Sequence, residues 1–109
     1  MTMLTDLEMV EKVLDELEGE AQKITRLAES GESEKCWEAW VRLTTYISFL
    51  NQAAQKHPSK QPGIIKRLLN WIQKIKSAVD KIVKGIGGNG YSIGISAPFG
   101  VSISISFTA

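Results

Sequence analysis

The residues with catalytic potential in this chain are few and lie far apart in the sequence. The 109 residues include one cysteine, Cys36, and one histidine, His57, which together could serve as a thiol nucleophile and its base. His57 stands beside a proline in a predicted loop, and no pattern places Cys36 near it. A lone cysteine packed as a small apolar side chain is the commoner case. We therefore expect a protein that is not an enzyme.

Neither the acidic residues nor the glycines form a recognisable ligand site. Neighbouring carboxylates such as Asp15 with Glu16, or Glu18 with Glu20, are typical of a solvated helix face, and no second acidic cluster has metal-ligand spacing. The glycine-rich segment 85–90 follows a predicted helix and precedes a predicted strand. A phosphate-binding loop requires the opposite order, strand before loop and helix after it. We expect no metal and no cofactor.

The strongest pattern in the chain is in its C-terminal tail, where apolar residues alternate with serine or glycine. Alternation with a period of two is typical of a strand that buries one face. The alternation breaks at 97–100, where Pro98 suits a type I turn and Gly100 can take the positive φ that follows it. The pattern predicts a hairpin. Its apolar face, which is the candidate interaction surface, consists of Tyr91, Ile93, Ile95, Val101, Ile103, Ile105 and Phe107.

The turn also predicts which residues face each other across the hairpin. A three-residue loop over 98–100 pairs Ala97 with Val101 and Ile95 with Ile103. Apolar residues then face apolar residues, whereas a slip by one residue would place isoleucine opposite serine throughout.

A third short strand before the hairpin is one of two interpretations of the glycine-rich segment. Asn89-Gly90 is a strong two-residue hairpin signal, and it would pair Ile86 with Ile93. The alternative is that the glycines cap the preceding helix and form a hinge.

Three helices are expected before the tail, at about 5–30, 33–56 and 62–84. Apolar residues recur in each at alternating spacings of three and four, which favours neighbouring helices packed near 20° in an up-down-up bundle. Ser33 is the expected N-cap of the second helix. The second helix must end before Pro58.

The predicted fold class is therefore α+β. A single domain spanning 1–109 would consist of a three-helix up-down-up bundle followed by a C-terminal antiparallel β-hairpin, or by a three-stranded meander, within a β tail at about 86–108. A chain of this length can bury a core without disulfides.

Charge is unevenly distributed along the chain. Residues 1–29 contain eight acidic and three basic side chains, whereas 62–109 contain one acidic and six basic side chains. The simplest interpretation is that the first and third helices lie side by side and attract each other weakly. The alternative is a cationic helix that contacts an anionic membrane. Its candidate contacts are Lys66, Arg67, Lys74, Lys76, Lys81 and Lys84.

Composition limits the classes of partner and the compartment. An isoelectric point near 7.8 lacks the basic balance of nucleic-acid-binding domains, so nucleic-acid binding is disfavoured. The N-terminus becomes acidic before any apolar run develops, and no stretch approaches the ~20 apolar residues of a spanning helix. Together with the single cysteine, these features predict a cytoplasmic protein.

The functional hypothesis comes from the tail, because residues 85–109 contain no charged side chain. An isolated hairpin is marginal in water and has two open edges, which soluble proteins normally protect with lysine, proline or bulges. The leading hypothesis is a non-catalytic oligomerisation or protein-interaction module that forms a homo-oligomer, or binds another protein, through these strands. The alternative is a membrane-active protein that uses the cationic third helix and the hairpin, although strands of about seven residues are shorter than the ~9–11 that a spanning strand needs.

Overall fold

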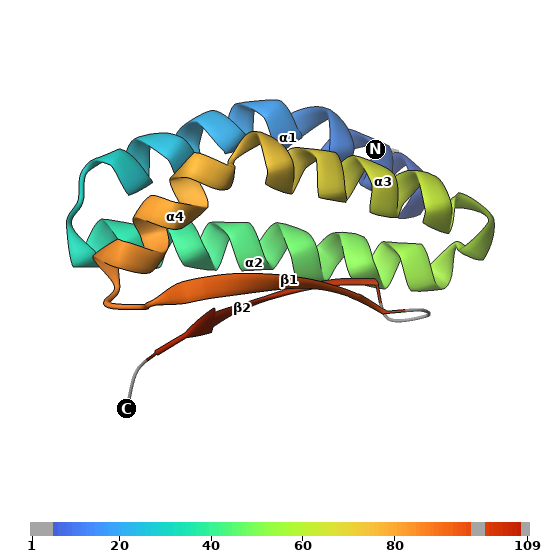
Figure 1. Ribbon diagram of the computed structural model, residues 1–109. Coiled ribbons are helices and arrows are strands. Elements are labelled where there is room, and N and C mark those ends of the chain that lie inside the picture. Colours follow the sequence, from blue (N-terminus) through green and yellow to red (C-terminus); the bar gives the residue numbers. More distant parts are fainter. Residues whose placement is uncertain (1–5, 97–99, 108–109) are drawn as a thin grey trace.

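The computed structural model describes residues 6–96 and 100–107 and confirms the α+β class. Four helices precede an antiparallel hairpin (Figure 1): α1 (Asp6–Glu29), α2 (Ser33–Lys56), α3 (Gln61–Lys74), α4 (Lys76–Gly85), β1 (Gly90–Ser96) and β2 (Gly100–Ser106). A short 3-10 turn, Pro58–Lys60, joins α2 to α3. The bounds of α2 agree with the prediction, because Gly31 and Pro58 interrupt the helical pattern on either side.

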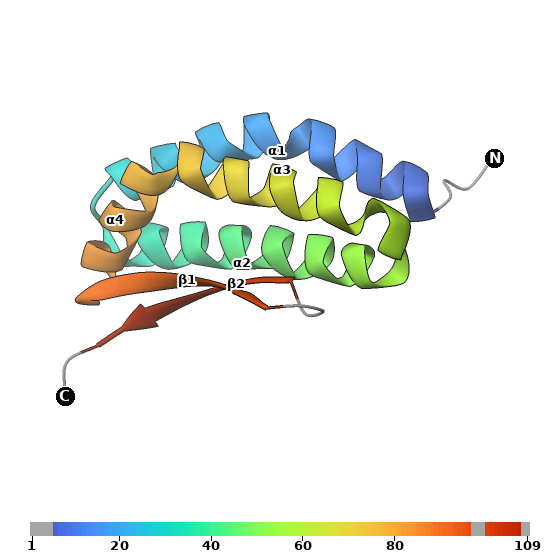
Figure 2. The ribbon, with the colours of Figure 1, turned by 45° about the vertical axis from the view of Figure 1, so that its right-hand side comes forward.

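The hairpin lies against the helices and not apart from them. Figures 1 and 2 show β1 and β2 running beneath the helices, along most of the length of α2. The helix α2 packs against α1, α3, α4 and β2, while α4 packs against β1. The helical layer therefore supplies the surface that an isolated hairpin lacks.

The third predicted helix, 62–84, is two helices. Between α3 and α4 stands Ile75, with φ −102° and ψ 19°, and its N–H is shared between the carbonyls of Trp71 at 3.3 Å and Ile72 at 3.2 Å. No glycine or proline marks this break, so the pattern predicted one continuous helix. The side chain of Ile75 is buried, and the break turns α4 toward β1 (Figure 1).

The N-cap of α2 differs from the predicted residue. Ser33 is the first helical residue, and the N-cap is Glu32, whose side chain makes no capping hydrogen bond. The turn before it is closed by Ser30, whose Oγ accepts the Glu32 N–H at 3.2 Å and donates to the Leu27 carbonyl at 2.8 Å. Gly31 adopts φ +72° in this turn, a conformation that favours glycine.

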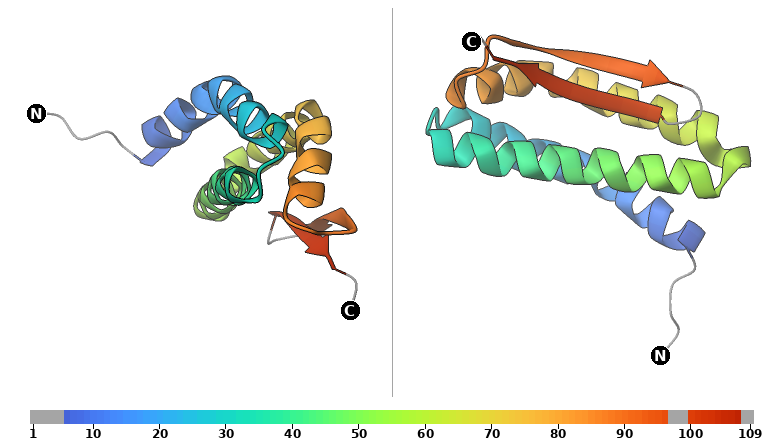
Figure 3. Two further views of the ribbon diagram at one scale, coloured as in Figure 1. Left: turned by 90° about the vertical axis from the view of Figure 1, so that its left-hand side faces the viewer. Right: turned by 90° about the horizontal axis from the view of Figure 1, so that it is seen from below.

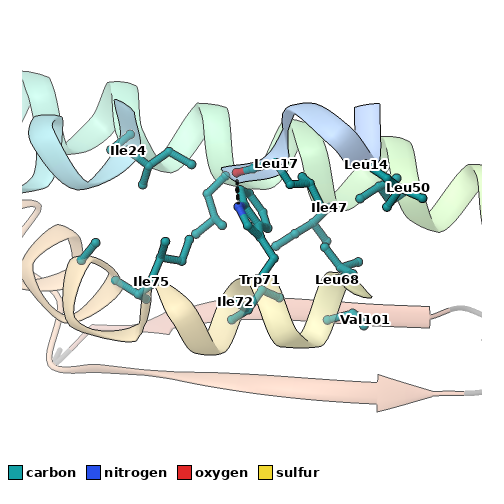
Figure 4. Packing of buried hydrophobic residues seen from close by; sticks show 14 of the residues in the cluster. Leu14, Leu17, Ile24, Ile47, Leu50, Leu68, Trp71, Ile72, Ile75 and Val101 are labelled. Atoms are coloured by element: carbon teal, nitrogen blue, oxygen red, sulfur yellow. Dashed lines mark hydrogen bonds between the residues drawn. The ribbon is translucent and has the colours of Figure 1, made fainter. Parts of the chain in front are cut away.

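The core lies between the helices and continues into the hairpin (Figure 4). Residues of α1, α2, α3, α4 and β2 contribute to one buried cluster, and Val101 of β2 is only 2% exposed. In α3, Ile64, Leu68 and Ile72 are buried, while Ile65 is only partly buried. Trp71 is also buried, and its Nε1 donates to the Leu17 carbonyl at 2.7 Å. Helix α3 therefore joins the core through both aliphatic and aromatic side chains.

The hairpin register corrects the predicted pairing by two residues. Ile95 faces Val101, and Ile103 faces Ile93, so apolar residues do face apolar residues, but the predicted pair of Ile95 with Ile103 is wrong. The ladder ends with the pair of Ser96 and Gly100, and Gly100 adopts φ +92°. The type I turn assigned to Pro98 lies outside the described residues.

The glycine-rich segment caps a helix and forms no third strand in the part of the chain that the structure describes. The Gly87 N–H bonds to the Lys84 carbonyl at 3.2 Å, and the Gly88 N–H bonds to the Val83 carbonyl at 2.8 Å. With Gly87 at φ +84°, this is a Schellman motif. The β structure therefore begins at Gly90 and not near residue 86.

Close packing between α4 and α2 makes Gly85 a test of the fold. A Cβ added at Gly85 would collide with Cys36 Sγ and lie 2.9 Å from Cys36 Cβ, and Cys36 is fully buried. We expect Gly85→Ala to lower the free energy of unfolding by about 1–3 kcal/mol, the usual cost of overpacking. Urea denaturation measures it.

Two variants serve as controls for this prediction. Gly19→Ala meets nothing within 4 Å and should raise the stability by about 0.5–1 kcal/mol through helix propensity. In a Cys36→Ala background, Gly85→Ala should cost less, because the colliding Sγ is gone and only the 2.9 Å contact with the Cβ of residue 36 remains. An equal cost in both backgrounds would contradict this explanation.

Candidate functional site

The apolar face of the hairpin, selected from the sequence, is directed at the chain's own helices. Val101 is buried in the core, whereas Phe107 is 55% exposed. Ile95 lies in β1 opposite Val101. The other four residues of this face are partly buried and packed against the core: Tyr91, Ile93, Ile103 and Ile105. Most of the face is thus occupied within the chain, whereas the opposite face of the hairpin is exposed to solvent.

The opposite face of the hairpin is an exposed array of small residues. Its members with described side chains are Ser92, Gly94, Ser102, Ser104 and Ser106. The hydroxyls of Ser92 and Ser104 lie 3.0 Å apart across the two strands. This face supports the pairing of β1 with β2 and carries no charge.

The outer edge of β2 is held by a side chain of α2. Asn51 binds the backbone of Val101 twice: its Nδ2 donates to the Val101 carbonyl, and its Oδ1 accepts the Val101 N–H at 3.0 Å. These two backbone groups therefore point away from β1. Asn51 takes the place of a neighbouring strand at this position.

The contact with Asn51 also shows which backbone groups face outward along the whole hairpin. The N–H and C=O of one residue point to the same side of a strand, and successive residues alternate. The ladder pairs β1 and β2 residue for residue, so the alternation continues without a bulge. The outward-facing residues are Val101, Ile103 and Ile105 on β2 and Tyr91, Ile93 and Ile95 on β1.

The outer edge of β1 is open. Seen from below (Figure 3, right), β2 lies between β1 and α2, and no described helix or strand flanks the other side of β1. Within the described residues, no hydrogen bond from a helix, turn or side chain reaches the backbone of Tyr91 or Ile93. The strand has the sequence GYSIGIS, without charge or proline. It therefore presents an unprotected edge.

A groove of about 470 Å³ runs beside this edge, between β1 and the helices α3 and α4. Ile72, Tyr91 and Ile93 give it apolar walls, and Lys76 and Asp80 of α4 also line it. Burial raises the pKa of Tyr91, and the nearby Asp80 carboxylate raises that pKa further. The groove thus combines apolar surface with one charge of each sign.

Two of the six candidate cationic residues form ion pairs with acidic residues of α1. Lys74 pairs with Glu18 at 3.3 Å and Lys81 with Glu29 at 4.0 Å, as the simplest interpretation of the charge pattern predicts. Both pairs are exposed and contribute little to stability. The remaining cations of this set are exposed: Lys66, Arg67, Lys76 and Lys84, of which Arg67 also donates to the Leu14 carbonyl at 3.3 Å.

Cys36 and His57 do not form a catalytic pair. They lie at opposite ends of α2, 21 residues and roughly 30 Å apart along the helix. Burial raises the pKa of the Cys36 thiol, which disfavours the reactive thiolate. No group of three or more His, Cys, Asp or Glu side chains within the described residues could hold a metal ion.

The sequence did not predict two polar contacts, one between α2 and β2 and one between α1 and α2. Asn51 has no sequence signal, because its partner Val101 lies 50 residues away. Glu20 is only 5% exposed and binds Arg42 at 2.9 Å. Burial is the main cause that raises the pKa of Tyr46, and the Glu20 carboxylate raises that pKa further. The prediction that Glu20 lies on a solvated helix face is wrong, because Glu20 is buried against Arg42 of α2.

Comparison of this chain with family models, with curated proteins and with solved structures finds no match. Among the described residues, no helix has the length and apolar character that crossing a membrane requires. The arguments about function that follow rest on the geometry of the hairpin and of the groove beside it.

Proposed function

We propose that this chain is a non-catalytic assembly module, in which the helices form the scaffold and the hairpin supplies the contact with another subunit. The contact is the outer edge of β1, where a strand of a neighbouring subunit adds to the sheet. The single observation that supports this proposal is the open, uncharged edge of β1, at the margin of an otherwise well-packed structure.

An open strand edge is a strong binding feature because its backbone groups are already arranged to pair. The outward N–H groups of Tyr91 and Ile93 can donate hydrogen bonds to an added strand, and their carbonyl oxygens can accept hydrogen bonds from it. These main-chain hydrogen bonds supply affinity, while neighbouring pockets supply specificity. The groove beside β1 gives such pockets, since Ile72 and Ile93 line it. Edges that have no binding role are usually protected by lysine, proline or a bulge.

The two edges of the hairpin differ, and β1 is the better candidate. The outer edge of β2 is bonded to Asn51 and lies on the side of α2. A strand approaching β2 would have to displace this contact. A strand approaching β1 meets only the groove.

Proline substitution at matched positions tests the proposal. Ile93 and Ile103 face each other in the ladder, both are partly buried, and the N–H of each points outward. Proline is tolerated on an edge strand where the N–H is unpaired. We expect Ile93→Pro to weaken self-association by more than about tenfold, because it removes a donor and adds a ring at the assembling edge. Sedimentation equilibrium over a concentration series measures the association.

Ile103→Pro is the control, because it loses a similar side chain at the same rung of the hairpin. Circular dichroism and thermal unfolding of both variants compare their folding. The proposal requires the unmodified chain and the Ile103→Pro variant to associate alike. A monomer at all concentrations for the unmodified chain, or equal weakening by both prolines, would overturn it.

A further inference from the structure

We infer that the strand added to β1 is β1 of a second copy, running antiparallel about a two-fold axis that passes beside Ile93. This inference rests on the proposed role of β1 as the assembling edge. It specifies the partner, the direction of the added strand and its register. The resulting sheet has four strands in the order β2, β1, β1 of the second copy and β2 of the second copy.

The register follows from the positions of the outward-facing residues. Tyr91, Ile93 and Ile95 are spaced two residues apart, with Ile93 in the middle. Centred on Ile93, an antiparallel pair sets Ile93 against Ile93 of the second copy and Tyr91 against Ile95 of the second copy. Each such pair exchanges both of its hydrogen bonds. A centre at any other residue of β1 leaves one or more of these groups without a partner.

The same arrangement keeps like faces together. Antiparallel pairing of odd-numbered residues with odd-numbered residues places both apolar faces on one side of the sheet. The helices of both copies then lie on that side, and the serine and glycine residues form one continuous face on the other. Closed two-fold symmetry of this kind uses both β1 edges, so assembly stops at the dimer.

The charges beside the edge favour a second copy of this chain as the partner. Lys76 and Asp80 are one turn apart on α4, both line the groove beside β1, and both are exposed. Neither makes an ion pair among the described residues. A two-fold axis reverses the direction of α4, and the proposed arrangement sets Lys76 of one copy opposite Asp80 of the second copy and the reverse. The grooves of two copies are thus complementary in charge to each other, whereas a wholly acidic or wholly basic peptide would meet one like charge.

Charge exchange tests this arrangement without touching the core. Lys76→Glu makes the groove wholly acidic and Asp80→Lys makes it wholly basic, so each variant alone should dimerise about tenfold or more weakly, through two like-charge contacts. An equimolar mixture of the two variants should restore dimerisation as a heterodimer. The double variant Lys76→Glu with Asp80→Lys should restore the homodimer. Sedimentation velocity at low salt, with one variant carrying a fluorescent label, measures both.

Lys84→Glu is the matched control, because Lys84 is exposed on α4 and does not line the groove; it should leave dimerisation unchanged. Single variants that dimerise like the unmodified chain, or a mixture no stronger than its parts, would overturn the two-fold arrangement. If Ile93→Pro still abolishes assembly in that case, the proposed function stands and only the arrangement fails. A chain that never associates would overturn both.

Discussion

Replacing Trp71 with alanine is expected to lower the free energy of unfolding by about 3–5 kcal/mol, the largest effect of any substitution we describe. Trp71 is 3% exposed and stands where α1, α2 and α3 meet. Its Nε1 donates to the Leu17 carbonyl at 2.7 Å, and its ring lies 5.8 Å from that of Tyr46, tilted by 47°. Alanine removes the ring, its contacts and the hydrogen bond together (Figure 4).

Chemical denaturation followed by circular dichroism measures this loss. Trp71→Phe keeps an aromatic ring but not the donor, so it should cost about 1–2 kcal/mol. Trp37→Ala is the control, because Trp37 is 47% exposed on α2 and its removal should change stability by less than about 1 kcal/mol. Similar losses for Trp37→Ala and Trp71→Ala would show that the core is not organised around Trp71.

The second large effect is expected from Asn51→Ala, which should release the hairpin from α2. Alanine leaves the N–H and C=O of Val101 without the partners that Asn51 supplies, in a residue that is 2% exposed. Each unpaired buried group costs about 1–3 kcal/mol. We expect hairpin docking to weaken by about 2–4 kcal/mol, partly offset by water that enters at the edge.

Hydrogen exchange locates the effect, because it reports on local opening. Amides of β1 and β2 should exchange faster in Asn51→Ala, while those in the middle of α1 keep their protection. Asn51→Asp retains an acceptor for the Val101 N–H but places a carboxylate oxygen against the Val101 carbonyl, so it should release the hairpin as well. Gln52→Ala, at the neighbouring exposed position, should have no effect. Unchanged exchange in the hairpin of Asn51→Ala would contradict this role of Asn51.

The helices could be predicted where local signals mark them. Leu14, Leu17 and Leu43 lie on the apolar spacing of α1 and α2 and are buried, since a helix repeats every 3.6 residues whatever its surroundings. The break at Ile75 could not be predicted in this way. It has no glycine or proline, and it arises because α3 and α4 must both bury apolar residues while α4 turns toward β1.

The candidate site, too, could be predicted from the sequence only in part. The period-two alternation identified the two faces of the hairpin, and apolar residues do face apolar residues across it. Which face or edge remains free depends on the helices. The apolar face chosen from the sequence packs mostly against the helices, whereas the open edge of β1 is a property of the backbone and of its neighbours, and no side-chain pattern marks it.

The sequence by itself determined the α+β class, the limits of α2, the hairpin, and the fact that apolar residues face apolar residues across it. Each of these follows from a repeat or a turn within a few neighbouring residues. Tertiary structure decided the break at Ile75, the exact register beside Gly100 and the capture of β2 by Asn51. These depend on contacts between residues as far as 50 positions apart, and the free energy of such a contact depends on how whole elements pack. By holding β2 beside α2, the same packing leaves β1 as the edge through which the chain can assemble.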